Sequence, residues 1–343
     1  MTFFLDGCSS TRKRTQLGEV YGPFPTVSGT DSHALGKQEE LLGPPAPYGP
    51  NPQLSSSISY GPNPDSLQPV VLVFGPGLAR GFAYAGVLRA LEEAKIPIGA
   101  IVASEMGGLI GVIYGLSESL NRFEWALQRL KEEDLFLEKS EYFSAFSKNM
   151  NDGKKLEVVL KKILGIKKLE KSRIPIHIIL EEEKSEKLIR VSGGSAVDIS
   201  RASVSFPSLF QGFLSAFPMS FGSVITSARE HPFPISEAKL LGIGPVIAIN
   251  LLNDDFSSLR ALTGAKKNTE LIFSYMREAK NRGESELKEA DFVLQPDMSE
   301  VGFLDFKKKN ESVFLGKDAV QVHLDEINQR LGLRKEPLIK ATP

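Results

Sequence analysis

The stretch IVASEMGGLIGVIYG, from Ile101 to Gly115, contains an apolar run, a short turn and a second apolar run that is rich in glycine. The first run has the length of a strand and the second that of a helix, so the pattern predicts a strand, a tight turn and a helix. In many hydrolases a turn of this kind exposes a catalytic serine at its apex. Glu105 occupies the apex here. The role of a carboxylate at that position is therefore the central question that the sequence raises.

A second unit of the same kind comes directly before it. Val70 to Phe74 is a continuous β-branched and apolar run, which is typical of a parallel strand covered on both faces. The glycine-rich turn GPGLARG follows at 75–81, and an amphipathic helix is expected from about Phe82 to Lys95. The turn matches a dinucleotide-binding fingerprint poorly, because Gly75 and Gly77 are not followed by a third glycine at the required place. It fits an anion cradle better, since N–H groups at a helix N-terminus favour negative charge, although a turn that merely needs glycine has the same pattern.

Strand-like and helix-like segments alternate through the rest of the chain. Further strands are expected at 98–104, 174–181, 188–192, 245–251 and 291–295, and helices at 107–116, 155–164, 234–241 and 270–281. This alternation predicts a three-layer α/β/α domain with a mostly parallel central sheet. We expect the domain to span residues 69–335 and to be followed by a short C-terminal tail at 336–343.

The first 68 residues have a different composition. They are rich in proline, glycine and serine and lack apolar periodicity, so they cannot bury enough surface to offset the entropy of the chain. We predict that residues 1–68 form a disordered N-terminal tether. Within it, YGPFP at 21–25 is followed by YGPNP at 48–52 and 60–64. These repeats are either low-complexity duplications or a docking motif for a protein partner in the cell envelope.

Cys8 is the single cysteine of the chain and stands directly before this tether. Leu5-Asp6-Gly7-Cys8 resembles a bacterial lipobox, in which a small residue precedes a cysteine that becomes lipidated. Asp6 and the shortness of the preceding apolar run depart from that pattern, so this interpretation requires a signal sequence upstream of Met1. We therefore expect a membrane-anchored lipoprotein of the bacterial cell envelope that faces the periplasm. If Met1 is the native start, the chain is expected to be cytoplasmic and Cys8 to be incidental.

The composition narrows the possible functions. Of the 343 residues, 41% are hydrophobic and 24% charged, as expected of a folded protein with a sizeable core. The formal net charge of −1 gives no global reason to expect a nucleic-acid partner. One cysteine and four histidines without ligand spacing argue against a metal site, and no cofactor is expected. The sequence also contains no apolar run of about 18 residues, the length that would span a membrane.

Several segments together resemble the patatin-like phospholipase family, most closely its bacterial branch with a GxGxxRG loop. They are GPGLARGFAYAGVL at 75–88, IVASEMGG at 101–108, RAS at 201–203 and HPFPIS at 231–236. The resemblance extends from about Pro69 to Leu333. It implies the three-layer fold, hydrolysis of lipid acyl esters by a serine–aspartate dyad, and an oxyanion hole in the first glycine loop.

Carried over position by position, the resemblance places both catalytic side chains on other residue types. The nucleophile position is Glu105, the position of the dyad aspartate is Thr226, and Ala103 replaces the leading glycine of the elbow. Ser104, Met106 and Gly107 complete the elbow. The oxyanion loop is retained, and the residues assigned to it are Gly75, Gly77, Leu78, Arg80 and Gly81.

Besides a purely structural envelope protein whose partner docks through the YGPNP repeats, two functions remain open. In the first, the protein is a catalytically inactive member of the family that binds lipid, an acyl chain or a protein partner through the remnant pocket. The carboxylate of Glu105 would then occupy the anion site itself, within reach of the Gly77 and Leu78 N–H groups. In the second, Glu105 serves as nucleophile or base of an active lipid acyl hydrolase. That chemistry requires a second acid or base, and residues 226–228 are Thr-Ser-Ala.

Two further features of the sequence each have two interpretations. Lysine and arginine are concentrated at 154–173 and again at 307–309, either as solvated helix faces or as a surface attracted to anionic lipid headgroups. The apolar segment from Phe210 to Met219 either lines an acyl pocket or belongs to the core.

Overall fold

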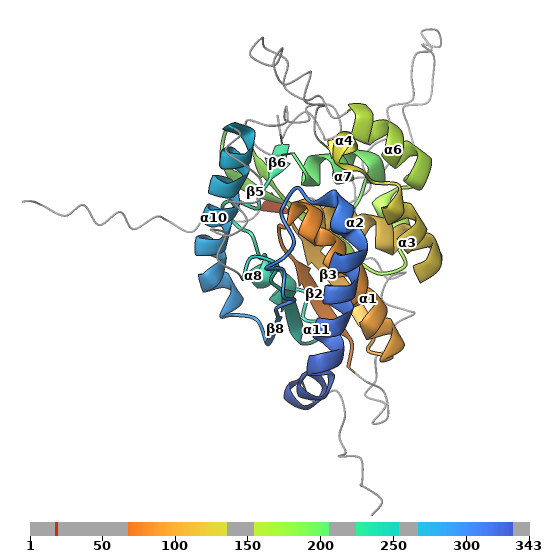
Figure 1. Ribbon diagram of the computed structural model, residues 1–343, viewed down its shortest axis with the longest axis vertical. Coiled ribbons are helices and arrows are strands. Elements are labelled where there is room, and N and C mark those ends of the chain that lie inside the picture. Colours follow the sequence, from red (N-terminus) through yellow and green to blue (C-terminus); the bar gives the residue numbers. More distant parts are fainter. Residues whose placement is uncertain (1–17, 20–67, 136–153, 206–223, 254–266, 332–343) are drawn as a thin grey trace, which may run out of the picture.

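The computed structural model of the chain describes residues 18–19, 68–135, 154–205, 224–253 and 267–331 (Figure 1). Cys8, the YGP repeats, the apolar segment from Phe210 to Met219 and the C-terminal tail lie outside the described residues. Within the predicted tether, Gly18–Glu19 form a short strand, β1, that pairs in parallel with a strand of the domain. The domain limits 69–335 stay a prediction.

The centre of the fold is a mostly parallel sheet, as predicted. Its order is β1-β5-β4-β3-β2-β7-β8, and β6 also pairs with β4. The run from β4 to β8 is parallel throughout, whereas β5 and β6 are antiparallel to β4. The bounds of the strands are β2 (Val70–Phe74), β3 (Ile98–Ala103), β4 (Ile176–Glu182), β5 (Lys187–Val191), β6 (Val224–Thr226), β7 (Val246–Ile249) and β8 (Phe292–Leu294).

Helices cover both faces of this sheet, which confirms the three-layer arrangement. Side chains alternate along a strand, so Val71 and Val73 face one layer while Leu72 and Phe74 face the other. The layer over Val71 and Val73 contains α8 (Ile235–Lys239) and the end of α10 (Lys267–Leu287). The opposite layer is larger and contains α1 (Ala83–Glu93), α2 (Glu105–Leu116), α3 (Leu120–Gln128), α4 (Glu132–Leu135), α6 (Lys154–Leu164), α7 (Ala196–Ser203) and α11 (Lys309–Arg330).

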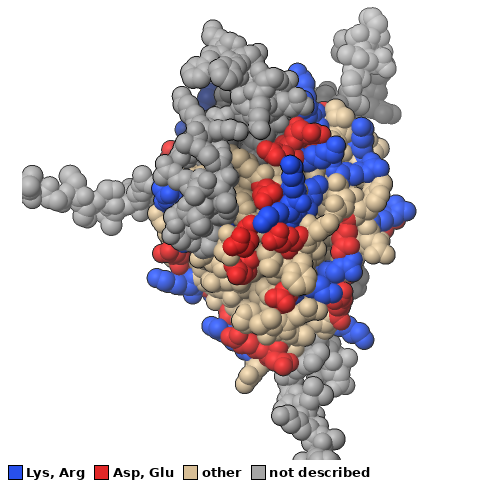
Figure 2. Space-filling view, viewed as in Figure 1, with Lys and Arg blue, Asp and Glu red and all other residues tan. Residues whose placement is uncertain are grey.

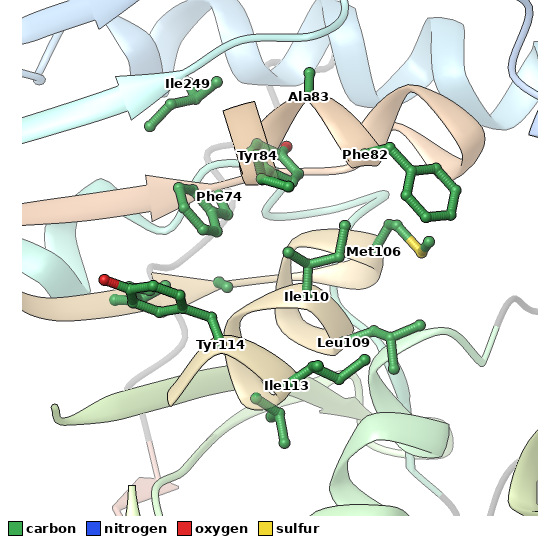
Figure 3. Packing of buried hydrophobic residues seen from close by; sticks show 14 of the residues in the cluster. Phe74, Phe82, Ala83, Tyr84, Met106, Leu109, Ile110, Ile113, Tyr114 and Ile249 are labelled. Atoms are coloured by element: carbon green, nitrogen blue, oxygen red, sulfur yellow. The ribbon is translucent and has the colours of Figure 1, made fainter. Parts of the chain in front are cut away.

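The core on the larger side is dense around the first two strand–turn–helix units. Figure 3 shows Phe74 of β2 packed against Tyr84 of α1, with Met106 and Ile110 of α2 on the other side. The rings of Phe74 and Tyr84 stack at a centroid distance of 4.3 Å. This packing holds β2, α1 and α2 in fixed relative positions, and the loops at the ends of β2 and β3 are positioned with them.

Most elements expected from the pattern are present, with ends that differ by one to three residues in the strands and α1, and by more at α10. The sequence pattern did not predict β6, α3, α4, α7 or α11. The buried positions of α11 include Ser312, Gly316 and Ala319. Small residues of this kind produce only a weak hydrophobic periodicity. For that reason the pattern did not predict this 22-residue helix. Among the described helices, none is both long and apolar enough to cross a bilayer.

Two glycines allow α1 and α11 to approach backbone to backbone. A Cβ atom added to Gly86 would lie 1.8 Å from the main-chain oxygen of Val313, and one added to Gly316 would lie 2.0 Å from that of Ala83. The contact is reciprocal, since each glycine faces the main chain of the other helix. Gly86 belongs to the segment that carried the family resemblance, and its structural role is this close approach.

Replacing Gly86→Ala should therefore destabilise the domain by at least about 3 kcal/mol, because the backbone of α11 has to move to make room. Urea unfolding followed by circular dichroism measures the change. Gly302→Ala is the matched control: its added Cβ would meet its nearest neighbour at 3.6 Å, so its effect should stay within about 1 kcal/mol. Equal stability of the two variants would contradict the proposed close contact.

Candidate functional site

The turn between β3 and α2 has the geometry of a strained elbow. Ser104 is extended, with φ −126° and ψ 161°, and Glu105 has a positive φ of 49°. A positive φ is uncommon for a residue other than glycine and persists only where the surroundings enforce it. Here Gly107 and Gly108 bring the helix close to its neighbours, because added Cβ atoms would lie 2.5 Å from Phe74 Cβ and 2.1 Å from the Ser203 hydroxyl. The elbow therefore keeps its shape with a glutamate at the apex.

The carboxylate of Glu105 lies in the glycine loop. Its Oε2 atom accepts a hydrogen bond from the Gly77 N–H at 2.6 Å and another from the Leu78 N–H at 3.1 Å. These are the two N–H groups that the sequence analysis expected it to reach. The side chain is fully buried, and its Oε1 atom has no hydrogen-bond partner among the described residues. The loop thus binds one carboxylate oxygen, while the other is buried without a hydrogen bond to offset its loss of water.

The five residues assigned to the oxyanion loop do not share one role. Gly77 and Leu78 supply the N–H groups, and the positive φ of Leu78, 47°, belongs to the same turn. Gly75 accepts a hydrogen bond from the Tyr84 hydroxyl at 2.8 Å, and a Cβ at Gly81 would meet Met106 Cγ at 2.5 Å. Gly75 and Gly81 therefore shape and pack the loop.

Arg80 braces the loop from outside. Its guanidinium donates to the main-chain oxygens of Val301 at 2.7 Å and Leu251 at 2.9 Å, and it lies over the ring of Phe303 at 4.3 Å. The assignment of Arg80 to the oxyanion hole is thus corrected to a supporting position. Its fully buried charge fixes the loop to two segments that are distant in sequence.

Burial raises the pKa of Glu105 to about 7, and the N–H groups of Met106, Leu78 and Gly77 lower it by less. The cause of the rise is the loss of water around the carboxylate, which penalises the charged form. Near neutral pH the group therefore exists in both protonation states. Any proton is expected on Oε1, because Oε2 already accepts two N–H groups.

Ser104 does not offer a replacement nucleophile. Its hydroxyl is already engaged, because it donates to the main-chain oxygen of Pro232 at 2.8 Å. The segment that it contacts is fixed by Glu286, which accepts from the Phe233 N–H at 2.8 Å and lies 3.2 Å from His231 Nδ1. The hydrogen bond to Glu286 is the main reason that the pKa of His231 is raised.

Thr226 lies next to the elbow, as the family pattern implies for the dyad position. On β4, Ile178 pairs with Ala103 and Leu180 pairs with Thr226, so β6 continues the line of β3. Two residues along a strand correspond to about 7 Å, and Glu105 follows Ala103 by two residues. Two serines at and just beyond the C-terminal end of α7 connect residues 105 and 226. The Ser203 hydroxyl donates to the Glu105 carbonyl, and the Ser205 carbonyl accepts from the Thr226 N–H.

The side chains at and after Thr226 are engaged locally. The hydroxyl oxygen of Thr226 accepts from the Ala228 N–H at 3.3 Å, and the Ser227 hydroxyl donates to the Ile179 carbonyl at 2.8 Å. None of these groups is a base at neutral pH. The structure thus brings close together the two positions that the resemblance assigns to a dyad, Glu105 and Thr226; their assignment to a dyad stays a prediction.

Two tyrosines near Glu105 were not found from the sequence. Burial, and then the charge of Glu105, raise the pKa values of Tyr84 and Tyr275. Tyr84 comes from α1 and Tyr275 from α10, and both belong to the larger of the two hydrophobic clusters. Aromatic residues at helical spacing are indistinguishable from core residues in a sequence, so no pattern could have assigned them to the site. Within the described ranges, no group of three or more His, Cys, Asp or Glu side chains is placed to hold a metal ion.

The sequence of this part of the chain matches a known protein family. Residues 72–231 match the family model described as patatin-like phospholipase. The chain contains a patatin-like phospholipase domain. The matched residues include both the elbow at Glu105 and the neighbouring Thr226.

Relatives of this domain are known among animals and fungi. Patatin-like phospholipase domain-containing protein 6 of Homo sapiens is 24% identical over 239 residues, which cover 68% of this chain and 16% of that protein. The lysophospholipase nte1 of Aspergillus fumigatus is 51% identical over 45 residues, or 13% of this chain and 3% of that protein. This chain therefore matches only a small part of those much longer proteins.

Two solved structures match parts of this chain at low identity. VipD from Legionella pneumophila is 11% identical, with 76% of this chain and 67% of that chain covered and a TM-score of 0.40. Human GIVD cytosolic phospholipase A2 is also 11% identical, with 78% and 59% covered and a TM-score of 0.44.

The raised pKa of Glu105 predicts how stability depends on pH. A carboxyl group with a folded-state pKa of about 7 and an ordinary value of 4.5 stabilises the fold fully below about pH 4.5, and that contribution is lost as the pH rises through 7. Glu105→Gln should remove this loss, since the amide oxygen can still accept from Gly77 and Leu78. At about pH 8 the variant should be more stable than the wild type by up to about 3 kcal/mol.

Urea unfolding at about pH 5 and about pH 8 measures the difference. Burial also raises the pKa values of Glu181 and Glu286, so part of the pH dependence should remain in both proteins. Glu93→Gln is the control, because the hydrogen bond from Lys317 lowers the pKa of this exposed carboxylate. A Glu105→Gln variant that loses stability with pH as steeply as the wild type would contradict the buried, proton-sharing state of Glu105.

Proposed function

We propose that this is a patatin-like domain in which the chemistry has been replaced by binding. The observation that carries the proposal is the pair of hydrogen bonds from the Gly77 and Leu78 N–H groups to Glu105 Oε2. In a serine hydrolase such N–H groups stabilise the oxyanion that develops during acyl transfer. Here Oε2 of the Glu105 carboxyl group occupies them in either protonation state, so no substrate carbonyl can enter.

The missing base supports the same conclusion. A serine–aspartate dyad needs a carboxylate beside the nucleophile to take its proton. The position beside the elbow is Thr226, whose hydroxyl accepts from the Ala228 N–H. Both halves of the dyad are therefore lost together, as expected when a protein keeps a fold but not its reaction.

The relatives suggest what the remnant site recognises. Their names are those of phospholipases and a lysophospholipase, so lipid or an acyl chain is the ligand class that we propose for this chain. A protein partner in the cell envelope is the second occupant to test. Retention of a formed elbow and a braced glycine loop is consistent with continued selection for the shape of the site.

One observation favours the alternative, an active lipid acyl hydrolase with unusual catalytic residues. A carboxyl group with a pKa of about 7 is well matched to proton transfer near neutral pH. Against this stand its complete burial and the two hydrogen bonds that hold Oε2. Ester hydrolysis by purified wild-type protein that disappears in Glu105→Gln would establish this alternative. It would overturn the hypothesis that the protein is catalytically inactive.

Restoring the dyad tests the proposal directly. Glu105→Ser alone should give little hydrolysis of a short-chain ester, because a serine hydroxyl without a base is a weak nucleophile. Adding Thr226→Asp should raise the rate by more than the product of the single effects, since the two side chains act as a unit. The new carboxylate can keep the hydrogen bond from the Ala228 N–H.

Thr226→Asp without the change at Glu105 is the matched control and should remain inactive, because the glycine loop is still occupied. The gain in the double variant is expected to be modest, since a misplacement of about 1 Å can cost a hundredfold in rate. Ser227→Gly in the same background should recover the family's turn further. Strong hydrolysis by Glu105→Ser alone would show that a base is already present. It would contradict our hypothesis that Thr226 stands at the position of a missing base.

For the N-terminus we propose a lipid anchor on Cys8, which would attach the domain to a bacterial envelope membrane through the predicted tether. A tether of about 60 flexible residues has a root-mean-square reach of about 40 Å, which leaves the domain close to that membrane. When the chain is expressed with an upstream lipoprotein signal, the wild type should fractionate with membranes and Cys8→Ser should appear in the soluble fraction. Metabolic labelling with a radioactive fatty acid should mark the wild type alone. A soluble, unlabelled wild type would refute the anchor.

A further inference from the structure

Positive charge is concentrated in one part of an otherwise balanced molecule. The segment Lys154 to Arg173, called the basic segment from here on, contains eight lysine and arginine residues and two glutamates. The whole chain has a formal net charge of −1, so the excess is local. In the view of Figure 2, Lys and Arg side chains crowd the upper right of the molecule, where Figure 1 places α6 and α3.

The basic segment is a firmly attached part of the fold. Leu156, Leu160 and Leu164 on one side of α6 are buried against the domain. One of the two glutamates, Glu157, pairs with both α7 and its own helix, since its Oε2 lies 2.7 Å from Arg201 Nη1 on α7 and its Oε1 lies 2.6 Å from Lys161 Nζ. The outer side of the helix is left with a net positive charge.

Apolar side chains also protrude from this outer side. Ile166 is fully exposed, at 101% of its reference area, and Val158 is 53% exposed. Ile166 follows Gly165, whose φ of +62° ends α6 and turns the chain outward. Lys161 and Lys162 precede this turn and Lys167 and Lys168 follow Ile166 directly. An exposed isoleucine is thus surrounded by lysines at the tip of a rigid turn.

This combination distinguishes between polyanionic partners. Single-stranded nucleic-acid sites combine basic residues with aromatic rings on which bases stack, and the basic segment contains no aromatic residue. Surfaces that bind anionic membranes combine basic residues, which approach the headgroups, with aliphatic side chains that enter the boundary of the acyl region. The protruding Ile166 and Val158 fit the second class.

We propose that the basic segment docks the domain onto an anionic lipid bilayer, with Ile166 entering the headgroup region and the surrounding lysines contacting lipid phosphates. The segment is coupled to the elbow, because the Lys167 ammonium donates to the Leu116 carbonyl at the C-terminal end of α2, whose N-terminal end carries Glu105. Docking would thus set the orientation of the elbow relative to the membrane. The proposal does not depend on whether the elbow is catalytically active.

Co-sedimentation with vesicles tests it on the full chain carrying Cys8→Ser, so that no acyl group contributes. The probes are vesicles of phosphatidylcholine alone and vesicles of phosphatidylcholine mixed with phosphatidylglycerol. The protein should sediment with the mixed vesicles only. Lys162, Lys168 and Lys171 are exposed, and changing all three to Gln should lower the partition coefficient about a hundredfold, since each lysine near an anionic surface contributes roughly fivefold.

Matched variants separate this surface from general charge. Changing Lys184, Lys187 and Lys288, which are exposed elsewhere, to Gln removes the same charge and should lower binding only slightly. Ile166→Ser should weaken binding about tenfold, whereas Val322→Ser, at a residue that is 69% exposed on α11, should have no effect. All variants should keep the circular dichroism spectrum of the parent.

Three outcomes would overturn the proposal. They are absence of binding to the mixed vesicles, equal losses in the two triple-lysine variants, and full binding by Ile166→Ser. If the basic segment instead binds a single-stranded oligonucleotide tightly, with no contribution from Ile166, the surface serves a nucleic acid and the membrane assignment is wrong. A loss confined to the first triple variant and to Ile166→Ser supports bilayer docking.

Discussion

The hydrogen bonds between the glycine loop and Glu105 are the constraint around which the rest of the site is arranged. Burying a carboxylate is costly unless its charge is compensated, and here the Gly77 and Leu78 N–H groups and the start of α2 provide that compensation for one oxygen. The arrangement requires positive φ values at both Leu78 and Glu105. Arg80, held by the main chain at Val301 and Leu251, keeps the loop in place from the other side. The pKa of Glu105, raised to about 7, reflects how incomplete the compensation is.

The packing that shapes the elbow does not depend on the side chain at its apex. Its backbone is enforced by close packing at Gly107 and Gly108 against Phe74 and Ser203, and none of these contacts involves the side chain at the apex. A change of that side chain can therefore abolish a reaction without disturbing the turn. The same logic applies to Thr226, whose position is set by the pairing of β6 with β4 and whose side chain only completes a local turn.

The helix α2 connects the two regions to which we assign functions. Its first residue is Glu105, and the carbonyl of its last residue, Leu116, accepts a hydrogen bond from Lys167 of the basic segment. On the same side of the sheet, α7 contacts both, through Ser203 to the Glu105 carbonyl and through Arg201 to Glu157 of α6. A packed core transmits such connections rigidly, so a surface that fixes α6 also fixes the elbow.

The local units were determined by the sequence alone. The apolar runs at Val70–Phe74 and 98–104, the glycine turn and the glutamate at the apex sufficed to predict a parallel three-layer fold, the elbow and the contact of Glu105 with Gly77 and Leu78. The reason is that strand–turn–helix units are specified by residues close together in the chain, through side-chain period and glycine placement. Gly86 was also noted in the sequence, as part of the segment that resembles the family. Its structural role, the close approach of α1 to α11, became clear only from the packing.

Long-range pairing was decided by the tertiary structure. The three-residue strand β6 has no pattern of its own, and only its register on β4 shows that Thr226 continues the line of β3 toward the elbow. The position of the loop depends on the hydrogen bonds from Arg80 to Val301 and Leu251, and the two tyrosines near Glu105 come from α1 and α10, two helices that are far apart in the sequence. The two contacts of Arg80 join residues 221 and 171 positions apart, and no local period or propensity encodes contacts between such distant segments. They exist because the sheet and its two helical layers fold back on the first two strands, and it is this closure that buries Glu105 and gives its carboxylate its raised pKa.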